Sequence, residues 1–476
     1  MRSQSLAGLG AMAVVLASLS VPSGTAVAEP GRIQRFSQVT QVQRISRDLI
    51  HGRKPSEDDT EVEPSLALDP LNALHQVAAF QDGRYPDGAA AAPGFATTFD
   101  GRSWITGVLP GVTRITGGVF ERSGDQVVTF GPDGSVYAVM TGFDGQFMPE
   151  RHTAILVLRS DDGGIRWNDP VIVREDRDFD VFHDNPSIAV DSDPSSSHFG
   201  RIYVTWVREH LIPRFTSPIV ISSSDDRGVT WSPFVNVSDK RSNGEGAHPM
   251  IASDGAVTVT WQPLLGEASR VAARTSTDGG QTFGPTVNIA DDEWKESPGM
   301  RSGFGLPSSA IDPVTGEMYV VWQDTRFRND GLNDALISFS TDGGATWTSP
   351  ARVNQDPLNS QLDHLTPVTA ARDGVVAVCY RTRLVSGSRG SIHVDMRCIH
   401  SEDGGISFEN ELPLGPVTDV RYAAKVYPFG GHWTAFLGDY MGVAVSGGTI
   451  LASWARSSLE GKPGGQHQTI WAGTIS

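Results

Sequence analysis

The sequence has little of three things that would place it in other classes of protein. It contains only 2 cysteines, and a single pair at their spacing supports neither a redox role nor a metal cluster. Beyond the first residues, no stretch approaches the roughly 18 consecutive apolar residues that a membrane-spanning helix needs. Positive charge is scarce, with 38 Lys and Arg against 55 Asp and Glu. The net charge of −17 argues against a nucleic-acid partner, because phosphate binding needs a cationic surface.

Helix-period runs are nearly absent as well. Short segments rich in Val, Ile, Trp and Tyr dominate, separated by turns in a chain with 52 Gly and 29 Pro. This texture predicts an all-β fold.

The first residues predict export. Arg2 supplies a positive start, an apolar run follows from Leu6 to Leu19, and small residues at 26 and 28 precede Glu29. Residues 1–28 therefore form a secretory signal peptide in this interpretation, and the protein is secreted, extracellular and without a membrane anchor. In an oxidising compartment we expect a disulfide between Cys379 and Cys398, which lie in two predicted neighbouring strands. Two unpaired thiols are the alternative.

One short motif occurs six times, about 60 residues apart. The copies are TFDGRSW (98–104), SDDGGIRW (160–167), SDDRGVTW (224–231), STDGGQTF (276–283), STDGGATW (340–347) and SEDGGISF (401–408). The Asp side chain can accept hydrogen bonds from the backbone N–H groups that follow it, and Gly allows the positive φ of a tight turn. The aromatic residue then anchors the turn in the hydrophobic layer. We therefore expect the six aspartates to be structural and not catalytic.

This motif is the Asp box, and the chain resembles the sialidase-type (BNR) β-propeller superfamily over nearly all of its predicted mature length. The resemblance implies a closed wheel of four-stranded blades with the Asp boxes on the face away from the active site. It does not carry over the catalytic residues of sialidases, because their Arg-Ile-Pro element is absent and LIPRF (211–215) reverses its order. No motif pairs a glutamate with Tyr440 or Tyr380.

A second repeat predicts where each blade begins. Its copies are EPSLALD (63–69), DQVVTFG (125–131), NPSIAVD (185–191), HPMIASD (248–254), LPSSAID (306–312), TPVTAAR (366–372) and DYMGVAV (439–445). They predict a propeller of seven four-stranded blades over residues 63–476. The N-terminal segment 29–62 would complete the last blade with a strand from within residues 35–46, which protects the open edge. Six blades, with residues 31–95 as an appendage, are the alternative.

The loops that enter the inner strands of a propeller open on one face around the central axis. Acids, a histidine and a tyrosine gather there as candidate catalytic residues: Glu63, Asp125, Asp184, His248, Asp439 and Tyr440. Candidate substrate-binding residues are His183, Arg208, Asp324, Arg326, His364 and Arg381. Paired carboxylates can act as acid and base when their pKa values differ, and arginines bind anionic groups. For any single residue, a turn-capping or local pairing role is the plainer interpretation. Three histidines (183, 248, 364) could hold a metal, but we expect no metal and no cofactor.

These observations predict a secreted carbohydrate-active enzyme, a sialidase-like glycoside hydrolase acting on an anionic glycan through its axial carboxylates. A lyase on an acidic polysaccharide is a variant of the same hypothesis. The predicted partner is a carbohydrate, and the protein is expected to be a monomer. The alternative is a non-catalytic propeller that binds a glycan or a protein through the same mouth.

Overall fold

A computed structural model describes residues 36–50, 56–57, 59–145, 152–265, 268–386, 389–426, 434–446, 448–459 and 466–476. The predicted signal peptide, residues 1–28, lies outside this range. No described helix is long and apolar enough to cross a membrane.

Almost all regular structure is antiparallel sheet, and the strands follow one another along the chain in groups of four. The groups are β2 (Glu61–Asp69), β3 (Asn72–Arg84), β4 (Ala90–Thr98) and β5 (Ile105–Val108); β6 (Arg122–Phe130), β7 (Val136–Phe143), β8 (Thr153–Ser160) and β9 (Val171–Asp176); β10 (Val181–Val190), β11 (Ile202–His210), β12 (Ile219–Ser224) and β13 (Val235–Asn236); β14 (Asn243–Ile251), β15 (Val257–Leu265), β16 (Ala268–Ser276) and β17 (Val287–Asp292); β19 (Ser308–Ile311), β20 (Met318–Asp324), β21 (Asp334–Ser340) and β22 (Ala351–Arg352); β23 (Leu362–Arg372), β24 (Val375–Ser386), β25 (Arg389–Ser401) and β26 (Glu409–Pro413). The first two groups are joined by one pair, Ala90 with Ser123.

A last four-stranded sheet joins the two ends of the described chain. It has the order β1-β32-β31-β30, with β30 (Gly442–Ser446), β31 (Thr449–Ser457), β32 (Gln468–Ile475) and β1 (Val39–Arg44). The strand that the sequence places within residues 35–46 is thus β1, which pairs antiparallel with β32, for example Val42 with Gly473.

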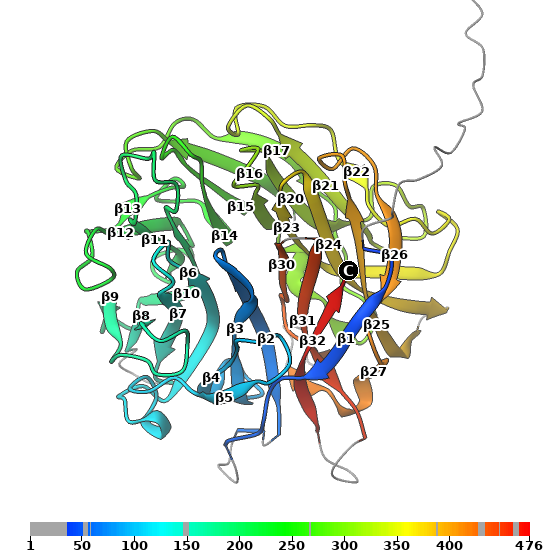
Figure 1. The fold of residues 1–476 in the computed structure, drawn as a ribbon, viewed down its shortest axis with the longest axis horizontal. Coiled ribbons are helices and arrows are strands. Elements are labelled where there is room, and N and C mark those ends of the chain that lie inside the picture. The colour runs from blue at the N-terminus through cyan, green and yellow to red at the C-terminus, as the bar shows by residue number, and fades with distance from the viewer. Residues whose placement is uncertain are drawn as a thin grey trace, which may run out of the picture. The chain divides into compact units, whose positions relative to one another are not determined.

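The first strands of these sheets surround a common axis (Figure 1). They contact one another in the cyclic order β2, β6, β10, β14, β19, β23, β30 and back to β2. The ring is therefore closed, and hydrophobic clusters fill the spaces between neighbouring sheets. The all-β prediction is confirmed, with four-stranded antiparallel sheets in a propeller-like arrangement.

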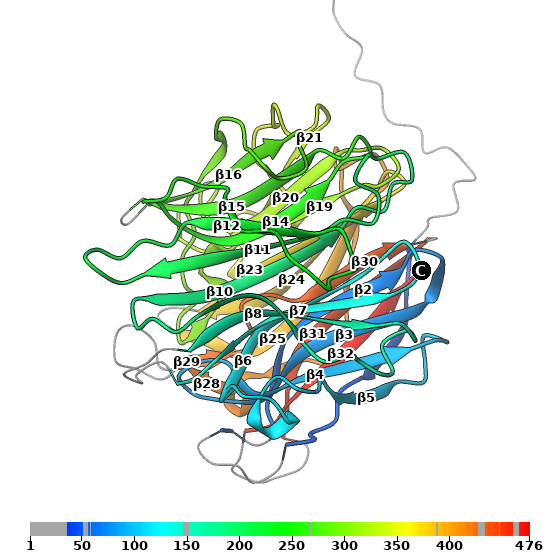
Figure 2. The same ribbon diagram turned by 90° about the vertical axis from the view of Figure 1, so that its left-hand side faces the viewer.

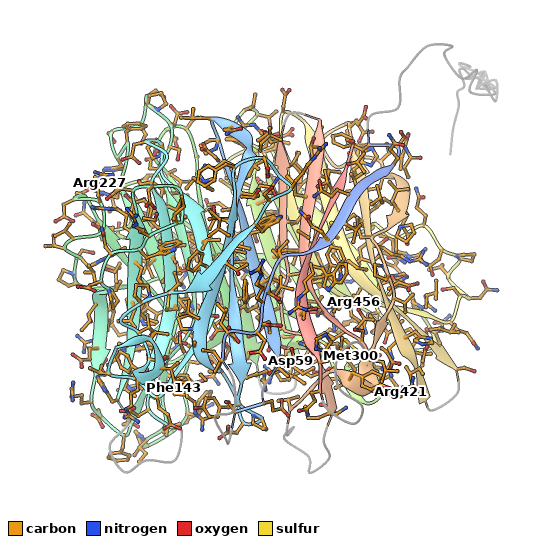
Figure 3. All side chains as sticks on the ribbon, turned by 60° about the horizontal axis from the view of Figure 1, so that its bottom comes forward. Asp59, Phe143, Arg227, Met300, Arg421 and Arg456 are labelled. Atoms are coloured by element: carbon orange, nitrogen blue, oxygen red, sulfur yellow. A yellow bond between two sulfur atoms is a disulfide. The ribbon has the colours of Figure 1, made fainter. Side chains whose placement is uncertain are left out.

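The Asp boxes form the predicted turns. In the fifth copy, Asp342 accepts hydrogen bonds from the Ser340 hydroxyl at 2.8 Å and from the Thr346 backbone N–H at 2.9 Å. Gly344 has a φ of 85°, and its N–H donates to the Ser340 hydroxyl. Trp347 packs against the hydrophobic cluster below the turn. Arg227, in the third box, lies at the opposite end of the sheets from Met300 and Phe143 (Figure 3).

The predicted disulfide between Cys379 and Cys398 is present. It joins directly paired positions of β24 and β25.

Three further short strands form a sheet that the sequence analysis did not expect. They are β18 (Met300–Arg301), β28 (Ala424–Val426) and β29 (Thr434–Phe436), in the order β18-β29-β28. Three 3₁₀ turns accompany the strands: η1 (Arg114–Thr116), η2 (Gly303–Gly305) and η3 (Val420–Tyr422). β28 and β29 lie at one end of the ring of inner strands (Figure 2). This small sheet brings residues to the axial site.

Candidate active site

Bulges in the inner strands set the direction of the axial side chains. The ladder shifts register after Val62, Gly124, Asp184 and Leu365. The next residue in each strand has a left-handed backbone, with φ of 56° at Glu63, 55° at Asp125, 48° at Asn185 and 53° at Thr366. Such φ values are uncommon outside glycine and gather at functional sites, where a bulge redirects a side chain.

The fifth bulge corrects the sequence alignment of His248. In β14 the register shift falls between Glu245 and His248, and Gly246 takes the left-handed position with a φ of 63°. His248 therefore lies two residues beyond the position that matches Asn185. Burial lowers its pKa to about 4, although a hydrogen bond with the Pro307 backbone opposes this shift. The imidazole is neutral at neutral pH.

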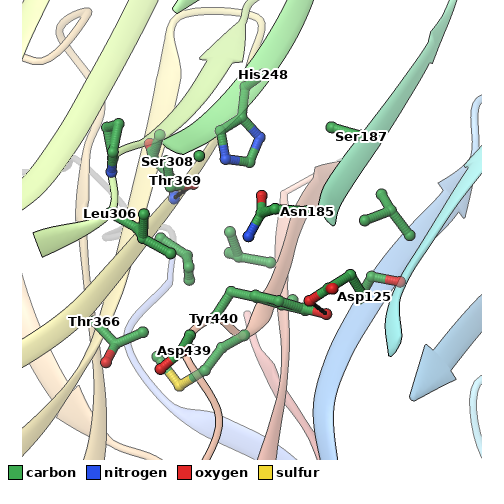
Figure 4. A pocket seen from close by; sticks show the side chains of 18 of the residues that line it. Asp125, Asn185, Ser187, His248, Leu306, Ser308, Thr366, Thr369, Asp439 and Tyr440 are labelled. Atoms are coloured by element: carbon green, nitrogen blue, oxygen red, sulfur yellow. Dashed lines mark hydrogen bonds between the residues drawn. The ribbon is translucent and has the colours of Figure 1, made fainter. Parts of the chain in front are cut away.

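The predicted axial acids and tyrosine do lie together. The Tyr440 hydroxyl donates to Asp125 Oδ1 at 3.3 Å, and the Asp439 backbone N–H donates to Glu63 Oε1 at 3.1 Å. Asp125 and Asp184 share a hydrogen bond between their carboxyl groups. Figure 4 shows Asp125, Asp439 and Tyr440 side by side. Five of the six candidate catalytic residues therefore form one contiguous group.

Burial raises the pKa values of this group. Burial first, and then the nearby Asp439, raise the pKa of Glu63 to about 7. Burial and then Asp184 raise the pKa of Asp125 well above its ordinary value. The pKa of Asp184 is raised by burial, and that of the Tyr440 phenol is raised by burial and by Glu63. Carboxyl groups that keep their protons near neutral pH are thus present at the axis.

Arg301 is the main site residue that the sequence analysis missed. Its Nε donates to Asp439 Oδ1 at 2.9 Å and its Nη2 donates to Oδ2, which makes a bidentate ion pair. The guanidinium also lies over the Phe304 ring at 4.3 Å and the Phe436 ring at 5.1 Å. Arg301 reaches the axis from β18, in the long connection between β17 and β19. Arg383 supports this connection by donating to the Pro298 carbonyl at 2.6 Å.

Two glutamates complete the acidic group. Burial and then Asp184 raise the pKa of Glu245 well above its ordinary value. Burial also raises the pKa of Glu296, which accepts hydrogen bonds from the Ser302 backbone N–H at 2.7 Å and hydroxyl at 2.8 Å. Glu245 directly precedes the bulge residue of β14, as Asp184 does in β10. A correct alignment of the bulges would have found it.

Arg381 is close to the axis, but its guanidinium donates hydrogen bonds to groups of the protein itself. Its side chain is 2% exposed. It donates to the carbonyls of Leu437 at 2.6 Å and Gly438 at 2.7 Å and to the Thr366 hydroxyl at 3.2 Å. Burial lowers its pKa to about 10. Arg381 therefore positions the segment that carries Asp439.

His183 and Arg208 bridge neighbouring sheets. His183 Nε2 lies 3.0 Å from Asp176 of β9, and its Nδ1 accepts a hydrogen bond from Trp206 Nε1 at 3.1 Å. Arg208 Nη2 reaches the same aspartate at 3.4 Å.

His364, Asp324 and Arg326 also bind other side chains of the protein. His364 Nε2 lies 2.9 Å from Asp356, and its ring packs edge-on against Tyr380. Asp324 accepts from Trp322 Nε1 at 3.0 Å and from Arg326 Nε at 3.0 Å. The expectation that these five residues gather with the axial acids is thus not met, because nearby partners hold them within the sheets.

A cavity of about 190 Å³ lies on the axis. Four of the candidate catalytic residues line it: Asp125, His248, Asp439 and Tyr440. Most of the remaining lining comes from the first strands, with aliphatic side chains such as Val443 and small hydroxyl side chains such as Ser187 and Thr369. Figure 4 shows Ser187 and Thr369.

One group with metal-ligand spacing lies away from the axis, in Asp334, Asp356 and His364. Two guanidinium groups already neutralise it. Arg352 Nε lies 3.0 Å from Asp334, and Arg328 Nη1 lies 3.7 Å from Asp334 and 3.8 Å from an Asp356 oxygen. The arrangement is that of a buried ion-pair network and not of a cation site.

Closed sheets, Asp-box turns and a polar axial site define a propeller-like protein of the Asp-box class. Residues 134–426 match the model of the family described as BNR repeat-like domain, and the chain belongs to that family. No curated protein is detectably similar to it in sequence.

Three solved structures are similar to the chain at low sequence identity. A protein of unknown function from Dyadobacter fermentans is 15% identical, with a TM-score of 0.46 over 92% of this chain and 98% of that one. The α-L-arabinofuranosidase of Fusarium graminearum, solved with arabinobiose, is 10% identical, with a TM-score of 0.48 over 72% of this chain and 92% of its own. The NanB sialidase of Streptococcus pneumoniae is 9% identical, with a TM-score of 0.44 over 88% of this chain and 93% of its own. At these values the likeness does not transfer an activity.

Proposed function

We propose that the protein is a carbohydrate-active enzyme, a glycoside hydrolase whose axial carboxyl groups act as acid and base. The observation that carries this proposal is the contact chain from Glu63 through Asp439 to Arg301, beside the hydrogen-bonded pair Asp125 and Asp184. Neighbouring buried carboxyl groups with raised pKa values can supply the acid and the base that glycoside hydrolysis needs.

Asp125 is the proton donor in this proposal, because burial and its neighbour Asp184 favour its protonated form. Glu63 is the base, since its pKa of about 7 lets it ionise near neutral pH. The Tyr440 phenol donates to Asp125 and lies near Glu63, and in this proposal the sugar contacts it between the two carboxyl groups. Arg301 positions Asp439.

The charge of the substrate is revised from the sequence-based prediction. An anionic glycan was expected because arginines were expected to surround the mouth. Arg208 and Arg326 bind carboxylates within the sheets, and Arg381 binds carbonyls. With the axial acids in excess, we propose a glycan without a carboxylate or sulfate at the position bound on the axis. A lyase acting on an acidic polysaccharide is correspondingly disfavoured.

A non-catalytic binding propeller is the second candidate. The observation that favours it is the ion pair between Arg301 and Asp439, which leaves that carboxylate little freedom to act on a substrate. Such a protein would retain a glycan at the axis without cleaving it.

A panel of neutral and acidic glycans tests the proposal. The purified protein should release reducing sugar from at least one neutral glycan and no unsaturated product from acidic ones. Retention of a glycan on the protein without any release would favour the binding propeller, and turnover of acidic glycans alone would contradict the proposed substrate charge.

The pH profile of turnover should distinguish the two carboxyl roles. We expect kcat/KM to rise with pH as Glu63 ionises at about pH 7, and to fall where Asp125, whose pKa is raised by burial, loses its proton. Initial rates across the pH range on any cleaved glycan would measure this. A rate that falls steadily from acidic to neutral pH would contradict the assignment of Glu63 as the base.

We also propose that the propeller has seven blades, which the cyclic contacts of the first strands support better than a six-bladed wheel with residues 31–95 as an appendage. We propose that the enzyme is secreted, on the basis of the export signal that residues 1–28 resemble.

A further inference from the structure

Two buried carboxylates outside the axial site lack hydrogen bonds of normal geometry with the described residues. Glu61 and Asp82 are direct partners across β2 and β3, so their side chains lie on the same face of the sheet. The residues are 0% and 1% exposed. None of their four carboxylate oxygens makes a hydrogen bond of normal geometry with a described residue. Buried charged groups in proteins are normally paired or bind a metal.

The pair does not belong to the axial site. Gln81 precedes Asp82 in β3 and therefore faces the other side of the sheet, where its Nε2 donates to Glu63. The side of Glu61 and Asp82 is covered by the N-terminal segment after β1. There the backbone N–H of Leu49 is directed at Asp82, and Ile50 packs with Ala92 of β4, the direct partner of Asp82.

The surroundings add negative charge. Burial, and then the charges of Asp48 and Asp59, raise the pKa of Asp82 to about 8. Burial and then Asp82 raise the pKa of Glu61 well above its ordinary value, against a smaller opposing effect of Arg44. In the ion-pair network of Asp334 and Asp356, by contrast, two arginines supply the positive charge. Here no guanidinium of a described residue forms an ion pair with either Glu61 or Asp82.

We propose that Glu61 and Asp82 are ligands of a bound Ca²⁺ ion that fastens the N-terminal segment to the first sheet. A hard cation with oxygen ligands satisfies unpaired carboxylates, and Ca²⁺ accepts irregular sets completed by backbone carbonyls and water. Zn²⁺ and similar ions are less suited, since the nearby His467 already directs its Nδ1 to Asp59 at 2.6 Å. The ion would lie where the chain passes from β1, in the last sheet, to β2 in the first.

This site can be tested without any substrate. The full chain is treated with a chelator, and its thermal unfolding is followed during titration with CaCl₂ or MgCl₂, while bound calcium is measured by elemental analysis. We expect Tm to rise with Ca²⁺ much more than with Mg²⁺, and bound calcium to approach one ion per chain. Glu61→Gln and Asp82→Asn, singly and together, should abolish both effects.

Asp356→Asn is the matched control. It also removes a carboxylate from a cluster of acids, but in that cluster arginines form ion pairs with the carboxylates. It should keep the calcium-dependent shift. The variants at 61 and 82 should unfold, without calcium, at the same or a higher temperature than the wild type, since each replaces a buried carboxyl group that lacks normal hydrogen bonds with a neutral amide that cannot ionise. Wild-type protein with no calcium-dependent shift and no bound calcium would overturn the proposal, as would a shift that survives in the double variant; Glu61 and Asp82 would then be a buried pair of neutral carboxylic acids.

Discussion

Asp125→Asn should lower kcat by about 10²–10⁴-fold on any glycan that the wild type cleaves, which is the usual contribution of a general acid. The amide keeps the shape of the side chain but has no proton to give to a leaving oxygen. KM should change little. Stability should be unchanged or higher, because burial raises the pKa of the Asp125 carboxyl and so disfavours its ionised form. Steady-state kinetics and thermal unfolding of the same preparation would measure both.

Asp324→Asn is the matched control for this prediction. Asp324 is fully buried and binds Trp322 and Arg326 within a sheet, whereas Asp125 lines the axial cavity. Its replacement should lower stability and leave kcat within a few-fold of the wild type. If Asp324→Asn abolished turnover while Asp125→Asn retained it, the assignment of the axial acids would be wrong.

Arg301→Gln should lower the free energy of unfolding at neutral pH by about 3 kcal/mol, because it leaves the buried Asp439 carboxylate without its charged partner. The double variant Arg301→Gln/Asp439→Asn should recover part of this loss, since no unpaired charge then remains. Denaturant unfolding of the wild type, both single variants and the double variant gives the coupling between the two residues. Additive losses would show that the ion pair does not fix Asp439.

Much of the fold could be predicted from the sequence because its signals are local. Each Asp box contains its own hydrogen-bond donors and acceptors, as Ser340, Asp342 and Thr346 show, so six copies identify six turns. The pairing of β1 with β32 followed from counting strands. Seven inner-strand openings against six Asp boxes leave the last sheet one strand short, and a strand from the N-terminal segment completes it.

The site was harder to predict because it depends on backbone irregularity. Alignment on the proline that most inner strands contain matched His248 with Asn185, whereas the bulge in β14 falls at Gly246, two residues earlier. The shift also concealed Glu245. Arg301 comes from a two-residue strand in a long connection, and its partner strand β29 is more than 130 residues away in the sequence. No periodic pattern marks such a contact.

The partners of the predicted substrate-binding arginines could not be inferred from the sequence, for a different reason. Sequence places Arg326 two residues after Asp324 at the end of a second strand, but it does not tell whether the two bind each other or a ligand. In the structure the Arg326 guanidinium donates hydrogen bonds to Asp324. The same holds for Arg208, whose partner Asp176 lies on the adjacent sheet.

The most direct test of the axial site is a crystal structure of the Asp125→Asn protein soaked with a glycan from the panel. The account predicts a sugar ring on the axis in contact with Tyr440, with the introduced amide at position 125 and the Glu63 carboxyl each within hydrogen-bond reach of the same glycosidic linkage. A glycan bound instead at the rim between two sheets or on the Asp-box face, with the axis empty of sugar, would contradict it.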